Sequence, residues 1–346
     1  MVVMWMMGCN SGGVKGEGTG GGEGRGLSGT MMEVGRSAER VFYAFVELMS
    51  DTLGLKVTKD TTKQQVGEYF NSLGGKLGEV SGELEKVTNK VTSGVDKSEE
   101  SKDGKNAIRI AVDSAKGVLA LLKTHLESLK NIGDDNKVVD VANNQNGVAA
   151  NSDALKIMCK ALKGIVEIAT KQGVKEPSAS SVTLAQASIG VDAKDGAKVL
   201  AAGANAGAAV GDKAAIIVSA VRGEEILASI VKSGESDAAV GANATADTSA
   251  ISFAKGGTAD HVSHEASAKA AAVAGGIALR ALVKEGKLAS HNDNNDHKAV
   301  QSVGISAVSK LLVSVEDIMK KAVKNVVEKV KKEVDKARDL QAVGQQ

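Results

Sequence analysis

Aromatic residues, proline and cysteine are all scarce in this sequence. Phe, Tyr and Trp together make up 2% of the 346 residues, and the chain has two cysteines and one proline, Pro177. Two cysteines cannot form a disulfide scaffold. The shortage of aromatic residues and of turn-forming proline also disfavours a β-sandwich, because strands prefer aromatic and β-branched residues.

An excess of charge of either sign is missing as well. The chain has 43 Lys and Arg against 42 Asp and Glu, which gives a formal net charge of +1. A nucleic-acid-binding protein needs basic residues to neutralise phosphates and aromatic residues to stack on bases. We therefore expect no nucleic-acid partner.

Apolar residues nevertheless reach 42% of the chain, supplied mostly by Ala, Val, Leu and Ile, and there are 40 glycines. A chain of this composition can bury a core, so disorder throughout is excluded. The Ala-rich and nearly proline-free composition favours helices, and we predict an all-α fold. Beyond the N-terminus no apolar run approaches the roughly 18 residues that a membrane-spanning helix needs.

The first nine residues are typical of a bacterial lipoprotein signal. Residues 1–7 are apolar, Gly8 is a small residue that suits a signal peptidase, and Cys9 follows. We predict that residues 1–8 are a partial signal, absent from the mature protein, and that Cys9 carries an N-acyl chain and an S-diacylglycerol. The run is shorter than the usual roughly 15–30 residues and lacks a basic start, as if the stated start lay inside a longer signal. A frayed apolar terminus is the alternative interpretation.

Residues 9–29, the predicted lipidated Cys and a Gly-rich stretch without an apolar face, are interpreted as a flexible tether. The stretch contains the spacing G-x-G-x-x-G at Gly16, Gly18 and Gly21. No strand precedes these glycines, so we expect neither a dinucleotide site nor any other cofactor. Residues 30–346 are then expected to form a single helical domain.

Apolar residues spaced by three and four predict helices at both ends of this domain. Residues 34–53 form one amphipathic stretch. Residues 66–91 form a heptad seam, which we place in a helix bundle because its glycines allow close approach between helices. A polar loop is expected over Thr92–Lys105 and a returning helix over residues 107–130. A long helix is predicted over residues 299–338; its lysine-rich face is expected to be solvated or, alternatively, to approach anionic lipid or glycan.

The Ala- and Gly-rich middle of the domain, residues 177–298, combines short apolar helices with polar loops. The stretches 214–228 and 270–289 are each expected to form an apolar helix that ends in a turn with a basic residue and Gly. Three loops with little apolar content look replaceable, and substitutions there are expected to cost under ~0.5 kcal/mol. These loops are Asn131–Ala154, Ser233–Ser249 and Ala289–Ala299.

Residues that could carry chemistry are few. Cys159 lies on an apolar helix face and is predicted to be a buried free thiol, and His125 beside another apolar stripe is predicted to be structural. His261 and His264 are spaced for one helical turn, and residues 291–297 could hold a divalent ion, although a solvated loop is the stronger interpretation. No nucleophile elbow, phosphate-binding loop or zinc motif is present, so we expect no catalytic or metal site and no enzymatic activity.

Three segments carry a resemblance to a known family. They are Ser50–Lys59, Val66–Glu85 and Gly276–Leu288, the last with the sequence Gly-Ile-Ala-Leu-Arg-Ala-Leu-Val-Lys-Glu-Gly-Lys-Leu. Together with Cys9 and the tether, they resemble the variable large proteins, surface lipoproteins of relapsing-fever Borrelia that are related to the Vmp-like variable antigen of Lyme spirochaetes. The resemblance covers nearly the whole chain from Cys9 onward.

The resemblance implies an elongated helical bundle with both termini near the membrane and with residues 177–298 as a variable middle, whose loops lie at the membrane-distal end. It implies a lipid-anchored coat protein of the cell outer membrane, which evades host antibodies by switching among related copies. An adhesin that binds a host glycan or protein is the alternative hypothesis, and a cytosolic helical bundle is the third. A homodimer is a further hypothesis.

Overall fold

The structure, a computed structural model, describes residues 40, 43, 55–92, 99–293 and 295–343. Within these residues all regular secondary structure is helical, and strand-like pairing is limited to isolated bridges such as Thr62 with Lys137 and Val148 with Lys287. The predicted all-α class is confirmed.

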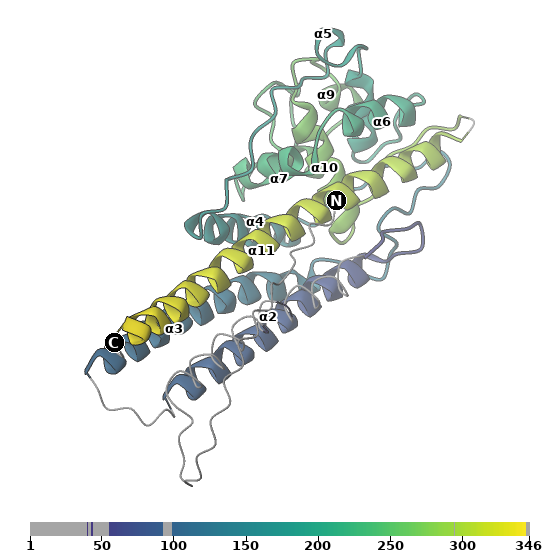
Figure 1. Ribbon diagram of the computed structural model, residues 1–346. Helices are drawn as coiled ribbons and strands as arrows, with labels where there is room; N and C mark the ends of the chain where they lie inside the picture. The colour runs from purple at the N-terminus through teal and green to yellow at the C-terminus, as the bar shows by residue number, and fades with distance from the viewer. Residues whose placement is uncertain (1–39, 41–42, 44–54, 93–98, 294, 344–346) are drawn as a thin grey trace, which may run out of the picture.

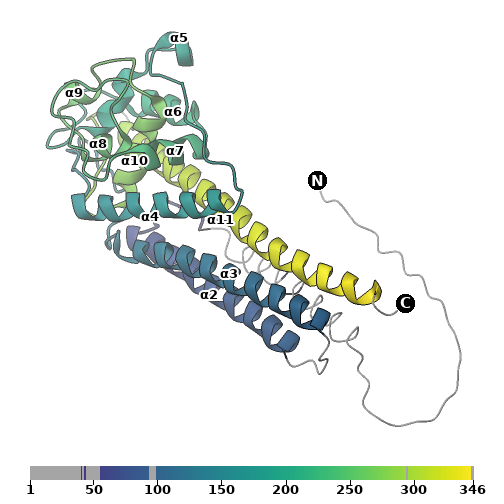
Figure 2. The same cartoon turned by 90° about the vertical axis from the view of Figure 1, so that its left-hand side faces the viewer.

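Three long helices form an elongated leg at one end of the molecule (Figures 1 and 2). They are α2 (Lys63–Thr92), α3 (Glu99–Ser128) and the C-terminal half of α11 (Asp296–Val343). The central helix, α3, packs against both of the others. A hydrogen bond from the Tyr69 hydroxyl of α2 to the Glu316 carboxylate also links α2 to α11.

The leg confirms most of the predicted periodicity. The seam of α2 is buried from Val66 to Leu84, and the predicted apolar stripe of α11 is buried from Val303 to Val334. The expected loop Thr92–Lys105 is partly wrong, because α3 already begins at Glu99. Polar residues there form helix without adding to the apolar pattern, so periodicity underestimates the helix. Of the predicted helix over residues 34–53, only positions 40 and 43 are described, and both are helical.

The shorter helices form a head around the N-terminal half of α11, with α5 at its tip (Figure 1). Because α11 runs from the head into the leg, it joins the two parts (Figure 2). The short elements are η1 (Leu129–Asn131) after α3, then α4 (Ser152–Lys171), α5 (Gln186–Ile189), η2 (Lys194–Leu200), α6 (Gly211–Ser219), α7 (Gly223–Lys232), α8 (Ala250–Lys255), α9 (Ala259–Val262) and α10 (Ala270–Leu282).

Helix α10 is the centre of the head. All 13 of its residues are buried, because α6, α7, α8 and α11 pack around it. A helix that is apolar on every side is stable only when it is enclosed in this way. Its glycines permit the close packing, since a Cβ at Gly276 would lie 2.5 Å from Cβ of Phe253. The Ala- and Gly-rich composition of the middle therefore serves tight packing as well as loops.

The stretch 214–228 contains two helices, α6 and α7, where the sequence predicted one. Arg222, between them, has extended backbone angles of φ −90° and ψ 161°. Gly223 then starts α7 directly against the backbone of α11, where a Cβ would lie 2.2 Å from the Lys310 carbonyl oxygen. A tertiary contact that leaves no periodic signal therefore decides where the helix breaks.

Candidate functional surface and the junction beneath it

The predicted lipidation site, Cys9, lies outside the described residues, together with the rest of the predicted signal and tether. Among the residues that the structure does describe, no helix is both long and apolar enough to cross a bilayer. Lipidation of Cys9 therefore stays a prediction.

Cys159 and His125 both serve the packing of α4, as the sequence indicated. The Cys159 side chain is fully buried, with Sγ 3.7 Å from the Ile230 carbonyl oxygen, and burial raises the pKa of its thiol. His125 of α3 packs against Gly164 of α4, where a Cβ would lie 2.2 Å from the imidazole Cε1 atom. Burial also lowers the pKa of His125, which favours the neutral imidazole in this contact.

The pair His261 and His264 does not share a helical turn. Helix α9 ends at Val262, so His261 is helical and half-buried, whereas His264 is exposed beyond the helix end. Across the described part of the chain, no group of three or more His, Cys, Asp or Glu side chains could hold a metal ion.

The segment around His291 and His297 is tied to the head through Asp296. The Asp296 carboxylate is buried and accepts hydrogen bonds from the backbone N–H groups of Val210 (2.8 Å), Gly211 (2.7 Å) and His291 (2.8 Å). An anionic side chain is favourable at this place because Gly211 begins α6. The expectation that this segment is a solvated, freely replaceable loop is wrong at Asp296.

The exposed surface of the head consists of short stretches between buried anchors. In the loop Ser233–Ser249, Val240 and Ala244 are buried, and most residues between and beside them are exposed. The backbone N–H groups of Val240 and Ala244 donate to the carbonyl oxygens of Gly256 (2.7 Å) and His261 (2.8 Å). The expectation that the whole loop is replaceable therefore does not hold at Val240 and Ala244, because small residues fill narrow spaces that a count of large apolar residues misses.

The loop Asn131–Ala154 lies at the junction between leg and head, where it touches both. A Cβ at its Gly147 would lie 1.9 Å from the Ala201 carbonyl oxygen, so the loop backbone packs directly on the head. The expectation of little core content is wrong here, since six of its apolar side chains are buried, the sixth being Ala154 at the start of α4. The other five are Ile132, Val138, Val139, Val141 and Ala150.

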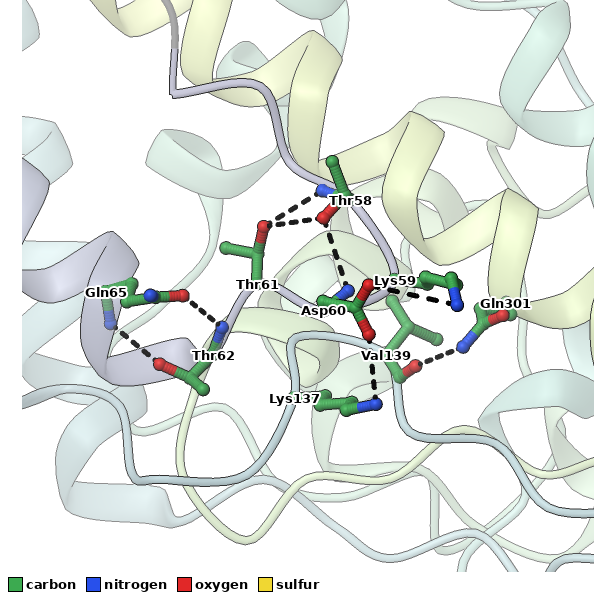
Figure 3. A network of polar contacts seen from close by, with 9 residues as sticks. All are labelled: Thr58, Lys59, Asp60, Thr61, Thr62, Gln65, Lys137, Val139 and Gln301. Carbon is green, nitrogen blue, oxygen red and sulfur yellow. Dashed lines mark hydrogen bonds and ion pairs between the residues drawn. The ribbon is translucent and has the colours of Figure 1, made fainter.

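The start of α2 is fixed at the same junction (Figure 3). The Gln65 N–H group donates to Thr62 Oγ1 (3.1 Å) and the Thr62 N–H group donates to Gln65 Oε1 (2.8 Å), which is a capping box. On the other side of the junction, the Gln301 amide of α11 donates to the Val139 carbonyl oxygen (3.0 Å). The spacing T-x-x-Q before the heptad seam is a sequence signal that could have located this helix start.

Two buried cations lie at and above the junction, and no sequence pattern marks either of them as buried. Arg280 of α10 is 0% exposed, and its guanidinium donates to the carbonyl oxygens of Ala254 (2.9 Å), Ala201 (2.7 Å) and Phe253 (3.2 Å). Two of these carbonyls belong to the last turn of α8, where a positive charge is favoured. Burial lowers the pKa of Arg280 to about 9, which still leaves it charged at neutral pH.

Lys63, at the start of α2, is the second buried cation and is 1% exposed. Its ammonium donates to the carbonyl oxygens of Val283 (2.7 Å), Gly286 (2.6 Å) and, more weakly, Arg280 (3.4 Å). Within the described residues neither Lys63 nor Arg280 forms an ion pair, and the hydrogen bonds of both cations go to backbone carbonyl groups. A residue class that is almost always exposed gives no sequence signal of such burial.

An open groove of about 850 Å³ runs along α11 beside the head. It is bounded by residues 173–178, the start of α7 and the exposed face of α11, on which Val313 is 57% exposed. Charges of both signs line it. The charged residues are Lys175, Glu176, Arg222, Glu224, Lys310, Asp317 and Lys321.

Comparison with known proteins identifies the family to which this arrangement belongs. A family model described as Borrelia lipoprotein matches residues 38–334. The chain belongs to this family. The chain is 59% identical over 354 residues to Variable large protein 25 of Borrelia hermsii, an alignment that covers 100% of the chain and 95% of the relative. Variable large protein 18 of Borrelia hermsii is 57% identical over 351 residues, with the same coverage.

A solved structure shares the fold of this chain. The crystal structure of the Lyme disease variable surface antigen VlsE of Borrelia burgdorferi matches with a TM-score of 0.72 and 22% identity, covering 90% of this chain and 100% of that chain. At this identity the match shows the fold alone. The helical architecture is therefore compatible with sequences that are only 22% identical.

Two of the three segments that carried the resemblance lie entirely within the described residues. Val66–Glu85 is the body of α2, and Gly276–Leu288 comprises most of α10 and the turn after it. The second segment contains Arg280 and the carbonyl groups that Lys63 contacts. Both segments have structural roles, since the first forms one of the three leg helices and the second forms most of the central helix of the head.

Proposed function

We propose that this chain is an outer-surface lipoprotein that acts as an antigenically variable coat protein and evades host antibodies by switching among related copies. The observation that carries the proposal is the similarity, over essentially the full chain, to proteins named variable large proteins. The construction of the head supports it, because exposed residues alternate with buried anchors and can change without altering the core.

The proposal assigns a role to each part of the chain. Residues 1–8 are a partial lipoprotein signal, residues 9–29 are the lipidated Cys9 and a tether, and residues 30–346 are one helical domain. The lipid at Cys9 attaches the protein to the outer membrane, with the leg nearer to the membrane. The head, which contains the variable middle over residues 177–298, then faces the host.

Metabolic labelling tests the anchor. Cells that express the chain from its complete gene are grown with radioactive palmitate, and Cys9→Ser is compared with the unchanged protein. We expect the label to be lost in the variant, because the acceptor sulfur is gone. Cys159→Ser is the matched control, since that thiol is buried. Label retained by Cys9→Ser would exclude the anchor.

Antibody binding to intact cells tests the coat function. Serum raised against this protein is applied to cells that display it and to matched cells that display the 59% identical relative. We expect strong binding to the first and weak binding to the second, because exposed head residues dominate what antibodies reach. Equal binding to both would contradict a role in antigenic variation.

An adhesin is the alternative function, and the groove along α11 is the observation that favours it. Saturable binding of a heparin-like glycan that weakens with added salt would support an adhesin. Weak, non-saturating binding would contradict the adhesin, and the coat function would then be the remaining hypothesis. The hypothesis of a homodimer is separate, and light scattering on the full chain in detergent tests it.

A further inference from the structure

The turn after α10 folds back on the helix end and gathers backbone carbonyl groups around one point. The last carbonyl groups of a helix lack donors within the helix, so they need partners from elsewhere. Val283 leaves the helix in an extended conformation, and Glu285 has a φ of 70°, in the left-handed region. Gly286 then comes so close to the helix end that a Cβ there would lie 2.2 Å from the Arg280 carbonyl oxygen.

The Lys63 ammonium fills the point where these carbonyl groups converge. It lies 2.7 Å from the Val283 oxygen and 2.6 Å from the Gly286 oxygen, with the Arg280 oxygen at 3.4 Å. An ammonium has three donors and no acceptor, which matches three converging carbonyl oxygens. The contact spans the joint of the molecule, since Lys63 begins the leg helix α2 and the carbonyls end the central helix of the head (Figure 1).

The same turn is also bonded to the loop that follows α3. The Lys284 N–H group donates to the Ile132 carbonyl oxygen (2.8 Å), and the Glu285 N–H group donates to the Asp134 carboxylate (2.9 Å). The first turn of α2 bonds to this loop as well, because the Gln64 N–H group donates to the Asp134 carbonyl oxygen (2.9 Å). Three segments, the start of α2, residues 132–136 and residues 283–286, therefore enclose one ammonium.

We propose that Lys63 is a clasp between leg and head, whose loss opens these three segments together while the rest of the molecule stays folded. Without the Lys63 amino group, the buried carbonyl oxygens around it lose a donor, and Val283 keeps only the Gly286 N–H group (3.3 Å), which favours opening toward water. The body of α10 has its own partners in α7 and α8 and does not depend on the clasp. Lys63 therefore sets how often the end of this otherwise enclosed helix is exposed to solvent.

Hydrogen exchange of the full chain, read by mass spectrometry, tests the clasp. Lys63→Met removes the ammonium and keeps an unbranched apolar stem. We expect amide exchange about ten- to a hundredfold faster in peptides that cover residues 131–137 and 281–287, as for the loss of a buried hydrogen-bonding partner. Exchange in residues 270–279, 108–126 and 303–330 should stay unchanged. Lys59→Met, at an exposed lysine that precedes α2, is the matched control and should change none of these peptides.

A second variant keeps the proposal testable if Lys63→Met fails to fold. Gly286→Ala keeps the ammonium but displaces one of its acceptors, because the added Cβ meets the Arg280 carbonyl. It should give the same local pattern of faster exchange. Unchanged exchange in both segments, or an equal rise in every peptide of the molecule, would overturn the clasp, since the first means no role and the second means only general stabilisation.

Discussion

At the residue scale, the unusual feature of this protein is the burial of positive charge without a carboxylate partner. Arg280 and Lys63 are bonded to backbone carbonyl groups at the ends of α8 and α10, where the helix dipole is negative. A third cation follows the same rule in a half-buried position, because the Lys310 ammonium donates to the carbonyl oxygens of Val218 and Val221 at the end of α6 (both 2.7 Å). Short helices of the head are thus completed by side chains from distant segments.

Replacing Arg280 by Met should destabilise the protein by about 2–5 kcal/mol. Three buried carbonyl groups each lose a hydrogen bond, at about 1–3 kcal/mol for a group left without a donor, although Ala254 keeps the Ala150 N–H group (3.4 Å). The variant also avoids the cost of burying the guanidinium charge, which offsets part of that loss. Denaturant unfolding monitored by circular dichroism measures the change. Arg222→Met is the control, because the side chain of Arg222 is 68% exposed, and it should alter stability by less than about 0.5 kcal/mol. Equal effects of the two substitutions would contradict the structural role of Arg280.

Lys63 gives a pH dependence with a defined sign. Burial, followed by the positive charges of Lys287 and Arg280, lowers its pKa from 10.5 to about 8, against the opposing effect of Asp134 and Glu285. Between about pH 8 and pH 10.5 the Lys63 amine holds its proton in the unfolded chain and releases it in the folded protein. The contribution of Lys63 to stability therefore rises with pH in this range.

The free energy of unfolding of the unchanged protein, minus that of Lys63→Met, should therefore increase by about 2 kcal/mol from pH 7 to pH 10. Urea unfolding at several pH values measures this difference, which cancels the titration of other groups. A difference that stays constant with pH would mean that the amine titrates normally despite its burial.

At the element scale, the glycines of α2 have two different roles. The sequence led us to expect that they all allow close packing between helices, and this holds at Gly67, where a Cβ would lie 2.3 Å from the Lys130 carbonyl oxygen. At Gly75 and Gly82 a Cβ would meet nothing within 4 Å. These two glycines therefore weaken the helix without a compensating contact.

Gly75→Ala should stabilise the protein by about 0.5–1 kcal/mol, because Ala has a higher helix propensity and reduces the freedom of the unfolded chain. Gly67→Ala should destabilise it, since the methyl group pushes α2 away from η1. Thermal melts of the two variants, measured side by side, provide the comparison. A loss of stability in Gly75→Ala would show that this position has a contact that the open space around it does not suggest.

At the scale of the whole molecule, the exposed surface of the head rests on anchors that come from the core. Exchanging the exposed side chains at residues 235, 236, 238, 239, 242 and 243, while Asp237, Val240 and Ala244 are kept, should leave the melting temperature within about 2 °C. The exchange should remove part of the binding by antibodies raised to the unchanged protein. Melting curves and antibody titres on the purified variant test both statements.

Substitution of a buried anchor in the same loop should, in contrast, lower the stability of the protein. Ala244→Asp places an unpaired charge at a position that is 0% exposed and should destabilise the protein by several kcal/mol. If the anchor substitution is tolerated, or if the surface exchange unfolds the head, the division of this loop into anchors and variable positions is wrong.

The sequence by itself determined the helical class, the seam of α2, the buried stripe of α3 and the long helix α11. Each of these depends on an apolar face that repeats at the helical period, and a repeating pattern can be read without knowing the partner surface. The family resemblance could also be recognised from the sequence, because each of its three segments is an unbroken run of residues. Cys159 and His125 were correctly placed in the packing for the same reason, since both lie on or beside an apolar stripe.

Only the tertiary structure decided that α10 is enclosed on all sides, that α6 and α7 are separate, and that Asn131–Ala154 belongs to the core. It also decided that Lys63 and Arg280 are buried. These features depend on backbone groups from distant segments, such as the carbonyl of Val283, which lies 220 residues beyond Lys63. Nearly every residue has the same backbone N–H and C=O groups. No sequence pattern therefore marks the few backbone groups that form hydrogen bonds with a distant side chain.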